Sequence, residues 1–179
     1  ESAAVDLANA LGCAVVVMAA AKSFFPEDHP QFAGIYWGEV SSPGAREIVD
    51  WADGVVAIGT VLNDYATVGW TAIPAGANVL NADIERAYFE GHDFGRIHLR
   101  DFLSALARKV VTRGSTRVEY ERQRPQPTVQ KAADPSARLM RAEIVRQLGP
   151  MVNAQTTVFA ETGDSWFNGM KLALPGGAR

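Results

Sequence analysis

The sequence has few of the residues that build redox or metal sites. Cys13 is its only cysteine, and it opens the apolar run of residues 13–18, so we expect a small buried hydrophobe and neither a nucleophile nor a disulfide partner. None of the three histidines, His29, His92 and His98, has a second His or Cys at the four-residue spacing of a helical metal site. We therefore predict no metal ligand here and a reducing, cytoplasmic environment.

Long apolar runs and one-sided charge are also missing. The longest apolar stretch, residues 13–21, is far shorter than the roughly 20 residues of a membrane helix, and no basic segment followed by an apolar one stands at the amino end. With 17 basic and 20 acidic residues the net charge is -3, and no cationic stripe is visible. These absences argue against a membrane and against nucleic acid as partners.

Nucleotide motifs are absent as well. No G-x-G-x-x-G follows a strand, and no P-loop with its lysine occurs, so no motif supports a dinucleotide or ATP site. What is present is a chain of 179 residues with 47% apolar residues, enough to bury one compact domain and the remnant of a second. The chain starts without Met inside a helical pattern and stops just after another, so we expect a piece of a longer protein.

The first part of the chain alternates helical and strand patterns. Helical spacing covers residues 1–11, 43–52 and 101–110, and apolar runs typical of buried parallel strands cover residues 14–18, 54–59 and 78–82. A loop containing Pro26, Pro30 and Gly34 follows the first of these strands. The order predicts an α/β domain over residues 1–111, with a Rossmann-like parallel sheet and ligands at the carboxyl ends of its strands. A noncatalytic nucleotide-binding module is equally compatible with this pattern.

The second part begins after a polar stretch. Residues 112–133 lose apolar periodicity and predict an extended, solvated linker. Asp134 as N-cap and Pro135 at the first helical position predict a helix with Met140, Ile144 and Leu148 on one face, ending at Gly149-Pro150. A strand at residues 157–160, a turn at 161–165 and a helix from Trp166 complete a second α/β unit over residues 134–179.

Two loops are candidate binding sites. In the turn Glu161-Thr-Gly-Asp-Ser165, Gly163 lets the backbone approach a ligand, and the following helix start attracts an anion such as phosphate. From the pattern alone, simple helix capping by Asp164 or Ser165 is the commoner explanation. The segment 63–70 carries Tyr65 and Trp70 after a predicted strand, and could line a crevice, although such a loop is more often a packing surface or subunit contact.

Several segments together resemble the bacterial pyruvate decarboxylases, a family of thiamine-diphosphate-dependent 2-oxo-acid decarboxylases. The segments are Met18-Ala-Ala-Ala-Lys-Ser-Phe-Phe-Pro-Glu27, Trp37-Gly-Glu-Val-Ser41, Asn63-Asp-Tyr65 with Gly69-Trp70, and Ala160-Glu-Thr-Gly-Asp-Ser-Trp-Phe-Asn168. The resemblance implies the middle domain, the linker and the start of the diphosphate-binding domain of a three-domain subunit. It also implies a homodimer or homotetramer in which neighbouring subunits share the cofactor, and conversion of pyruvate to acetaldehyde and carbon dioxide with thiamine diphosphate and magnesium.

The resemblance also implies roles for individual residues. Thr162, Gly163 and Asp164 match the turn beside the cofactor's diphosphate, where the Thr162 hydroxyl can donate to a phosphate oxygen. An ionised Asp164 would be repelled there unless a metal or a hydrogen-bond network compensates its charge. Tyr65 matches a tyrosine near the reaction centre.

The family's remaining active-site parts have no match in these residues. They are a first-domain glutamate, paired histidines, and a Gly-Asp-Gly motif with a later Asn that holds magnesium. We therefore expect no catalytic residue and no magnesium ligand in this chain, and no turnover by it alone. A decarboxylase of indolepyruvate or phenylpyruvate and an acetolactate-synthase-like enzyme remain alternatives.

Overall fold

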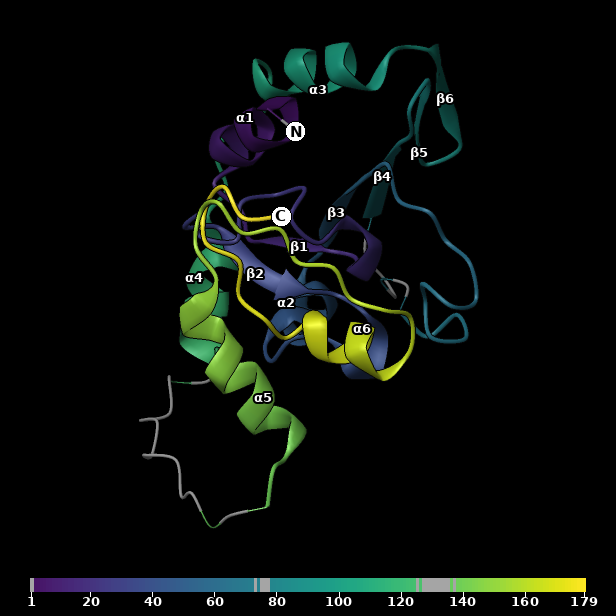
Figure 1. Ribbon diagram of the computed structural model, residues 1–179. Coiled ribbons are helices and arrows are strands. Elements are labelled where there is room, and N and C mark those ends of the chain that lie inside the picture. Colours follow the sequence, from purple (N-terminus) through teal and green to yellow (C-terminus); the bar gives the residue numbers. More distant parts are fainter. Residues whose placement is uncertain (1, 73, 75–77, 125, 127–135, 137) are drawn as a thin grey trace.

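The computed structural model describes residues 2–72, 74, 78–124, 126, 136 and 138–179. Its α-helices and strands, in chain order, are α1 (Ser2–Leu11), β1 (Val15–Val17), β2 (Phe32–Ile35), α2 (Ala45–Trp51), β3 (Gly54–Ile58), β4 (Asn78–Ala82), β5 (Arg86–Phe89), β6 (His92–Arg96), α3 (Leu99–Ala107), α4 (Ser115–Gln123), α5 (Arg141–Leu148) and α6 (Asp164–Gly169). Figure 1 shows their arrangement.

The predicted α/β class is confirmed by parallel strand pairs. The apolar runs form β1, β3 and β4, and β1 pairs with β2 in parallel, as β3 does with β4. Val-rich strands of this kind suit a sheet covered on both faces, because neither face needs polar residues. The strands lie in two sheets, one of order β1-β2 and one of order β3-β4-β5-β6.

The assignment of Gly34 to a loop was wrong, because it lies within β2 opposite Val16. Its φ of +110° suits only glycine, and a Cβ there would lie 2.7 Å from the Ser42 Cβ. The register shifts between Val15 and Val16, so Gly34 marks an irregularity in the pair. Glycine here permits close approach of the Ser42 segment and does not end the strand.

The hairpin of β5 and β6 was not predicted. Glu90 and Gly91 join the two strands and both have positive φ, +49° and +78°, as a two-residue type I′ turn requires. All five residues of β6 are exposed, so the strand carries no apolar alternation by which the sequence could reveal it. The second sheet is therefore mixed, with antiparallel pairing beyond β4.

Helices α1 and α3 pack together beside the second sheet (Figure 1). Leu7 of α1 and Leu103 of α3 are 1% and 3% exposed, and they share a core cluster with Ala82 at the end of β4. Helix α1 ends at Gly12, whose φ is +70°. The predicted helices at residues 1–11, 43–52 and 101–110 are thus confirmed, with ends shifted by up to a few residues.

The prediction of an extended linker was wrong for its first half, which contains α4. The Thr112 hydroxyl donates to the Ala10 carbonyl at 2.9 Å, and the Ala14 N–H donates to the Thr116 hydroxyl at 2.9 Å, so this segment is fixed to the end of α1 and the start of β1. Pairs such as Arg122 with Glu119, three residues apart, support the polar helix. Low apolar content here reflects an exposed helix.

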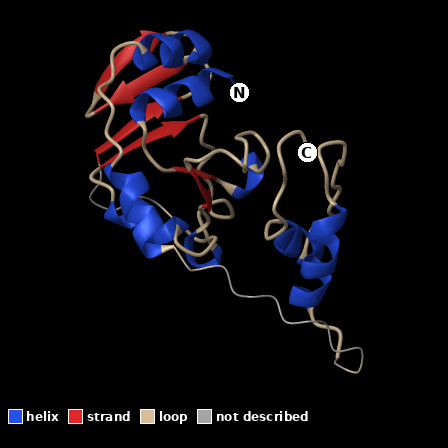
Figure 2. Ribbon diagram, turned by 90° about the vertical axis from the view of Figure 1, so that its left-hand side faces the viewer, coloured by secondary structure: helices blue, strands red, loops and turns tan. Residues whose placement is uncertain are grey.

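The C-terminal part contains α5 and α6, which stand beside the sheets in Figure 2. The predicted helix start at Asp134 and Pro135 lies outside the described residues, and α5 begins at Arg141. The strand predicted at residues 157–160 is absent, because its only ladder-like bonds join Thr156 and Val158 to Arg179. Helix α6 is present but shorter than the predicted segment of residues 166–174.

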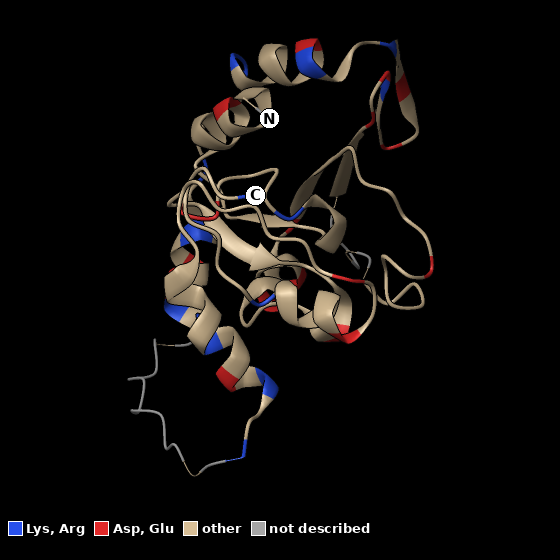
Figure 3. Ribbon diagram, viewed as in Figure 1, with Lys and Arg blue, Asp and Glu red and all other residues tan. Residues whose placement is uncertain are grey.

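The distribution of charged residues and the apolar content of the helices agree with the amino-acid composition. Lys and Arg are interspersed with Asp and Glu over the ribbon in Figure 3, as expected for a net charge of -3. None of the described helices is both long enough and apolar enough to cross a membrane.

Candidate cofactor and substrate site

Tyr65 lies in a loop after β3 that Asn63 and Thr67 organise. The Asn63 carbonyl accepts bonds from the N–H and the hydroxyl of Thr67, at 3.0 and 2.7 Å. The Thr67 side chain is fully buried, and its hydroxyl in turn accepts from the Trp70 N–H at 2.9 Å. A buried hydroxyl satisfied on both sides holds this loop in a single shape.

Trp37 fixes the backbone of Tyr65. Its indole N–H donates to the Tyr65 carbonyl at 3.0 Å, and its own N–H donates to the Ser41 hydroxyl at 2.7 Å. Trp37 is 3% exposed, so its ring cannot move without repacking the core. Tyr65 as a whole residue is 53% exposed, which leaves it accessible to a ligand.

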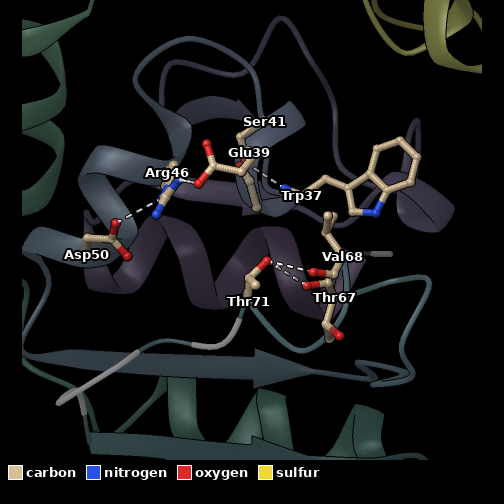
Figure 4. A network of polar contacts seen from close by, with 9 residues as sticks. Trp37, Glu39, Ser41, Arg46, Asp50, Thr67, Val68 and Thr71 are labelled. Carbon is tan, nitrogen blue, oxygen red and sulfur yellow. Dashed lines mark hydrogen bonds and ion pairs between the residues drawn. The ribbon is translucent and has the colours of Figure 1, made fainter.

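Figure 4 shows the polar contacts around this loop. Thr71 donates to the carbonyls of Thr67 and Val68, at 3.3 and 2.7 Å. Arg46 of α2 pairs with Glu39 and with Asp50, and the bond to Glu39 raises the pKa of the guanidinium. The exposed ion pairs are screened by water, so the buried threonine bonds carry the rigidity of the loop.

Four aromatic rings, Trp37, Tyr65, Trp166 and Phe167, form what we call the aromatic cluster. Trp37 meets Trp166 edge-on, with centroids 5.0 Å apart, and stacks on Phe167 at 5.0 Å and 12°. Tyr65 stacks on Trp166 at 5.7 Å and 16°. The cluster joins the loop after β3 to α6, elements of the two units that the sequence predicted.

The turn Thr162–Asp164 comes shortly before Trp166 and Phe167 in the chain. Gly163 has φ +105° and ψ -138°, a conformation that essentially only glycine adopts, and its carbonyl accepts from the N–H groups of Trp166 and Phe167. Apart from Gly163 itself and its two chain neighbours, no atom lies within 4 Å of a Cβ built on Gly163, so the turn is open on that side. Thr162 and Asp164 are both exposed.

Asp164 has a cationic partner, Arg141 at the start of α5. The Arg141 Nε lies 2.9 Å from the Asp164 Oδ2, and both side chains are largely exposed. An ionised Asp164 near an anion needs a compensating charge, and Arg141 supplies a positive charge beside it. Arg141 was not among the predicted site residues, since nothing in its local pattern indicates this contact.

The structure brings the predicted residues into one region through Trp166. Tyr65 stacks on this ring, and Trp166 follows Asp164 by two residues on α6. The sequence indicates Trp37 and Phe167 only as parts of motifs, and it does not reveal the contacts of Trp37 with Tyr65 and Trp166 or of Phe167 with Trp166. Among the described residues no group of three or more His, Cys, Asp or Glu side chains is arranged to hold a metal.

Comparison with known proteins identifies the class. Residues 1–108 match the family model described as the thiamine pyrophosphate enzyme, central domain. The chain therefore belongs to this family, and the α/β region with its parallel strand pairs is such a central domain.

The chain is also similar along its length to proteins that are named pyruvate decarboxylase. The chain is 49% identical over all 179 residues to a probable pyruvate decarboxylase of Schizosaccharomyces pombe and 46% identical to the pyruvate decarboxylase of Neurospora crassa, covering 31% of each. It is 35% identical over 176 residues, or 98% of its length, to pyruvate decarboxylase 1 of Pisum sativum, covering 30% of that protein. The chain thus spans about a third of these relatives. They are fungal and plant proteins, whereas the motifs indicated bacterial ones.

Proposed function

We propose that this chain is part of a pyruvate decarboxylase, which converts pyruvate and a proton to acetaldehyde and carbon dioxide with thiamine diphosphate and magnesium. The observation that carries the proposal is similarity along the whole chain, at 46 to 49% identity, to two proteins bearing that name. A place in the bacterial branch rests only on the motifs of residues 18–27, 37–41, 63–70 and 160–168 taken together, because the relatives named above are fungal and plant proteins.

The residues of the turn fit a diphosphate. Thr162 offers an exposed hydroxyl donor, and Gly163 leaves room for a phosphate oxygen to approach the backbone. Asp164 is paired with Arg141, so the turn does not present an uncompensated negative charge. When bound, thiamine diphosphate serves as the electron sink for decarboxylation.

Tyr65 is proposed to contact the substrate. Its backbone is held by the Trp37 indole and its ring by the Trp166 stack, while its side chain stays half exposed. A phenol held in this way can donate a hydrogen bond to a 2-oxo acid without a large loss of conformational entropy. We assign it a positioning role and no proton-transfer step.

We also infer the organisation of the whole enzyme. Residues 1–111 would be the central domain, residues 112–133 the connection, and residues 134–179 the start of the diphosphate-binding domain. We further propose that the whole enzyme is a homodimer or homotetramer in the cytoplasm and acts on a small-molecule 2-oxo acid. Light scattering of the purified complete polypeptide measures its oligomeric state.

The first experiment uses the complete polypeptide that carries these residues. Aldehyde formation is followed with pyruvate, phenylpyruvate and indolepyruvate, with and without thiamine diphosphate and magnesium. Acetaldehyde release that needs the cofactor and is fastest with pyruvate supports the proposal. A preference for phenylpyruvate or indolepyruvate would change the assigned substrate and keep the reaction. Failure to decarboxylate any of the three acids refutes the decarboxylase assignment.

The site residues are tested in the same polypeptide. Thr162→Ala is expected to raise the half-saturating concentration of thiamine diphosphate about tenfold, the value of a hydrogen bond to a charged group, and Thr162→Ser is expected to restore it. Thr157→Ala, at another exposed threonine of the same segment, is the matched control. Equal effects of Thr162→Ala and Thr157→Ala would remove Thr162 from the site.

A further inference from the structure

A buried ion pair joins Lys22 to Glu27 in the loop after β1. The Lys22 Nζ lies 2.6 Å from the Glu27 Oε1, and the two side chains are only 11% and 7% exposed. Charges removed from water in this way persist only where further hydrogen bonds satisfy their remaining atoms. The second carboxylate oxygen of Glu27 therefore needs a hydrogen-bond donor of its own.

That oxygen binds the far end of the chain. The Glu27 Oε2 accepts from the Leu174 N–H at 3.0 Å, and Leu174 is itself buried. The next residue, Asp28, accepts from the Gly176 N–H at 3.1 Å. A Cβ on Gly176 would lie 2.5 Å from the Asp28 Oδ2, so the two segments are in close contact.

This contact holds the chain that leads out of α6. Residues 170–174 follow that helix directly, and Met170 packs with Trp166 against the core cluster that contains Phe25 and Trp37. The turn Thr162–Asp164 thus precedes a six-residue helix that is fixed by the aromatic cluster and by the contacts that follow it. With no long helix or sheet to carry it, the turn depends on these attachments for its place relative to Tyr65.

We propose that Lys22, Glu27 and Asp28 form a latch that docks residues 170–179 on the central domain and so positions the Thr162–Asp164 turn against Tyr65. The positioning role rests on the proposed function, whereas the docking itself does not. Lys22 orients and neutralises the carboxylate, Glu27 carries the main bond, and Asp28 adds an exposed second one. All three act through the segment they hold, as positioning residues.

The simpler explanation is that the ion pair only stabilises its own loop, since Lys22 and Glu27 are five residues apart. Two variants separate the explanations. Glu27→Gln has one acceptor oxygen for two donors, so its amide NH₂ must face either Lys22 or the Leu174 N–H. Exchanging the pair, with Lys22→Glu and Glu27→Lys together, keeps both charges but puts a group with no acceptor at position 27.

Docking is measured by hydrogen exchange of the complete polypeptide, read by mass spectrometry. Glu27→Gln and the exchanged pair are both expected to speed exchange in residues 170–179 about tenfold or more, because a bond to a charged acceptor is lost, while residues 2–11 keep their protection. Glu39→Gln, which breaks the exposed pair with Arg46, is the matched control and leaves residues 170–179 unchanged. Wild-type exchange in the swapped pair or in Glu27→Gln would overturn the latch.

Kinetics then test the positioning role. In Glu27→Gln, the fold-increase in the half-saturating concentration of thiamine diphosphate is expected to be at least five times the fold-decrease in kcat. Glu27→Asp is expected to recover part of the lost cofactor affinity. If Glu27→Gln does not fold, Asp28→Ala, at an exposed position, is the test of the latch. Faster hydrogen exchange of residues 174–179 is expected in this variant, and unchanged exchange refutes the latch. A wild type that decarboxylates none of the acids refutes the function alone, because the exchange measurement still tests docking.

Discussion

The phenol ring of Tyr65 stacks on the indole of Trp166, with centroids 5.7 Å apart and 16° between the planes. One ring belongs to the loop after β3 and the other to α6, so this contact connects the central domain to the segment that follows it. Trp37 meets both rings and is almost fully buried, which gives the stack a rigid base. The stack is the most direct physical link between the two regions of the candidate site.

Loss of the Trp166 ring should therefore weaken the protein. We expect Trp166→Ala to lower the free energy of unfolding by about 2 kcal/mol, less than for a fully buried tryptophan because the side chain is only partly buried. Trp166→Phe should lose less, since a ring still packs against Trp37. Urea unfolding measures both, with Trp51→Ala, at a tryptophan 49% exposed, as control. Equal effects at positions 51 and 166 would contradict a bridging role.

The turn before α6 requires glycine for its backbone and not for space. Gly163→Ala meets no atom within 4 Å, so its expected cost of about 1 to 3 kcal/mol comes entirely from the positive φ of +105°. Gly54→Ala is the matched control, because Gly54 lies in β3 and a Cβ there makes only an ordinary contact with the Asn78 carbonyl at 3.8 Å. Thermal unfolding of the two variants compares them, and an unaffected Gly163→Ala would show that the turn tolerates other conformations.

The regular elements of the central domain were predictable because each is specified locally. The valines of β1 and β3, and the helical spacing of Val5, Ala8 and Leu11 on α1, indicate their structures without knowledge of distant residues. Gly34 was misassigned for the opposite reason. Its place in β2 depends on pairing with Val16 of β1, a tertiary contact that the surrounding prolines and glycines do not indicate.

The candidate site was predictable in part. The turn at Gly163 has a local signature, a glycine followed by a helix start, and its positive φ agrees with that pattern. The contacts of Trp37 with Trp166 and of Asp164 with Arg141 have none, because they form only when α6 and α5 are placed in space. Sequence patterns therefore indicated candidate residues for the site and not which neighbours hold them.

Gln31 is a buried residue whose side chain connects α1 to the start of β1, and its loss should lower the free energy of unfolding. It is 5% exposed, and its Nε2 donates to the carbonyls of Ala8 and Cys13 at 2.6 and 2.7 Å. Gln31→Met keeps the length of the side chain but removes both donors, and we expect a loss of about 1 to 3 kcal/mol in the free energy of unfolding. Gln155→Met, at an exposed position, is the control in urea unfolding. A neutral Gln31→Met would show that other donors satisfy these carbonyls.

Cys13 provides a prediction on pH. Burial raises the pKa of its thiol above the ordinary value of 9.0 and outweighs the opposing effect of a backbone hydrogen bond. The alkylation rate of the folded protein by iodoacetamide should therefore rise with an inflection above pH 9.0, whereas in concentrated guanidinium chloride the inflection should lie near the ordinary value. An inflection at or below pH 9.0 in the folded protein would contradict a buried thiol.

The same shift links Cys13 to stability. Above pH 9.0 the unfolded chain loses the thiol proton before the folded chain does, so the unfolded state binds fewer protons and the free energy of unfolding falls as pH rises. Below the ordinary pKa both states hold the proton and the effect vanishes. Cys13→Ala should reduce this slope just above pH 9, because the raised pKa values of Tyr36 and Tyr120 add a slope of the same sign only as the pH approaches their ordinary value of 10.0. Denaturant titrations across this interval measure the slope, and an unchanged slope in Cys13→Ala would assign it to another group.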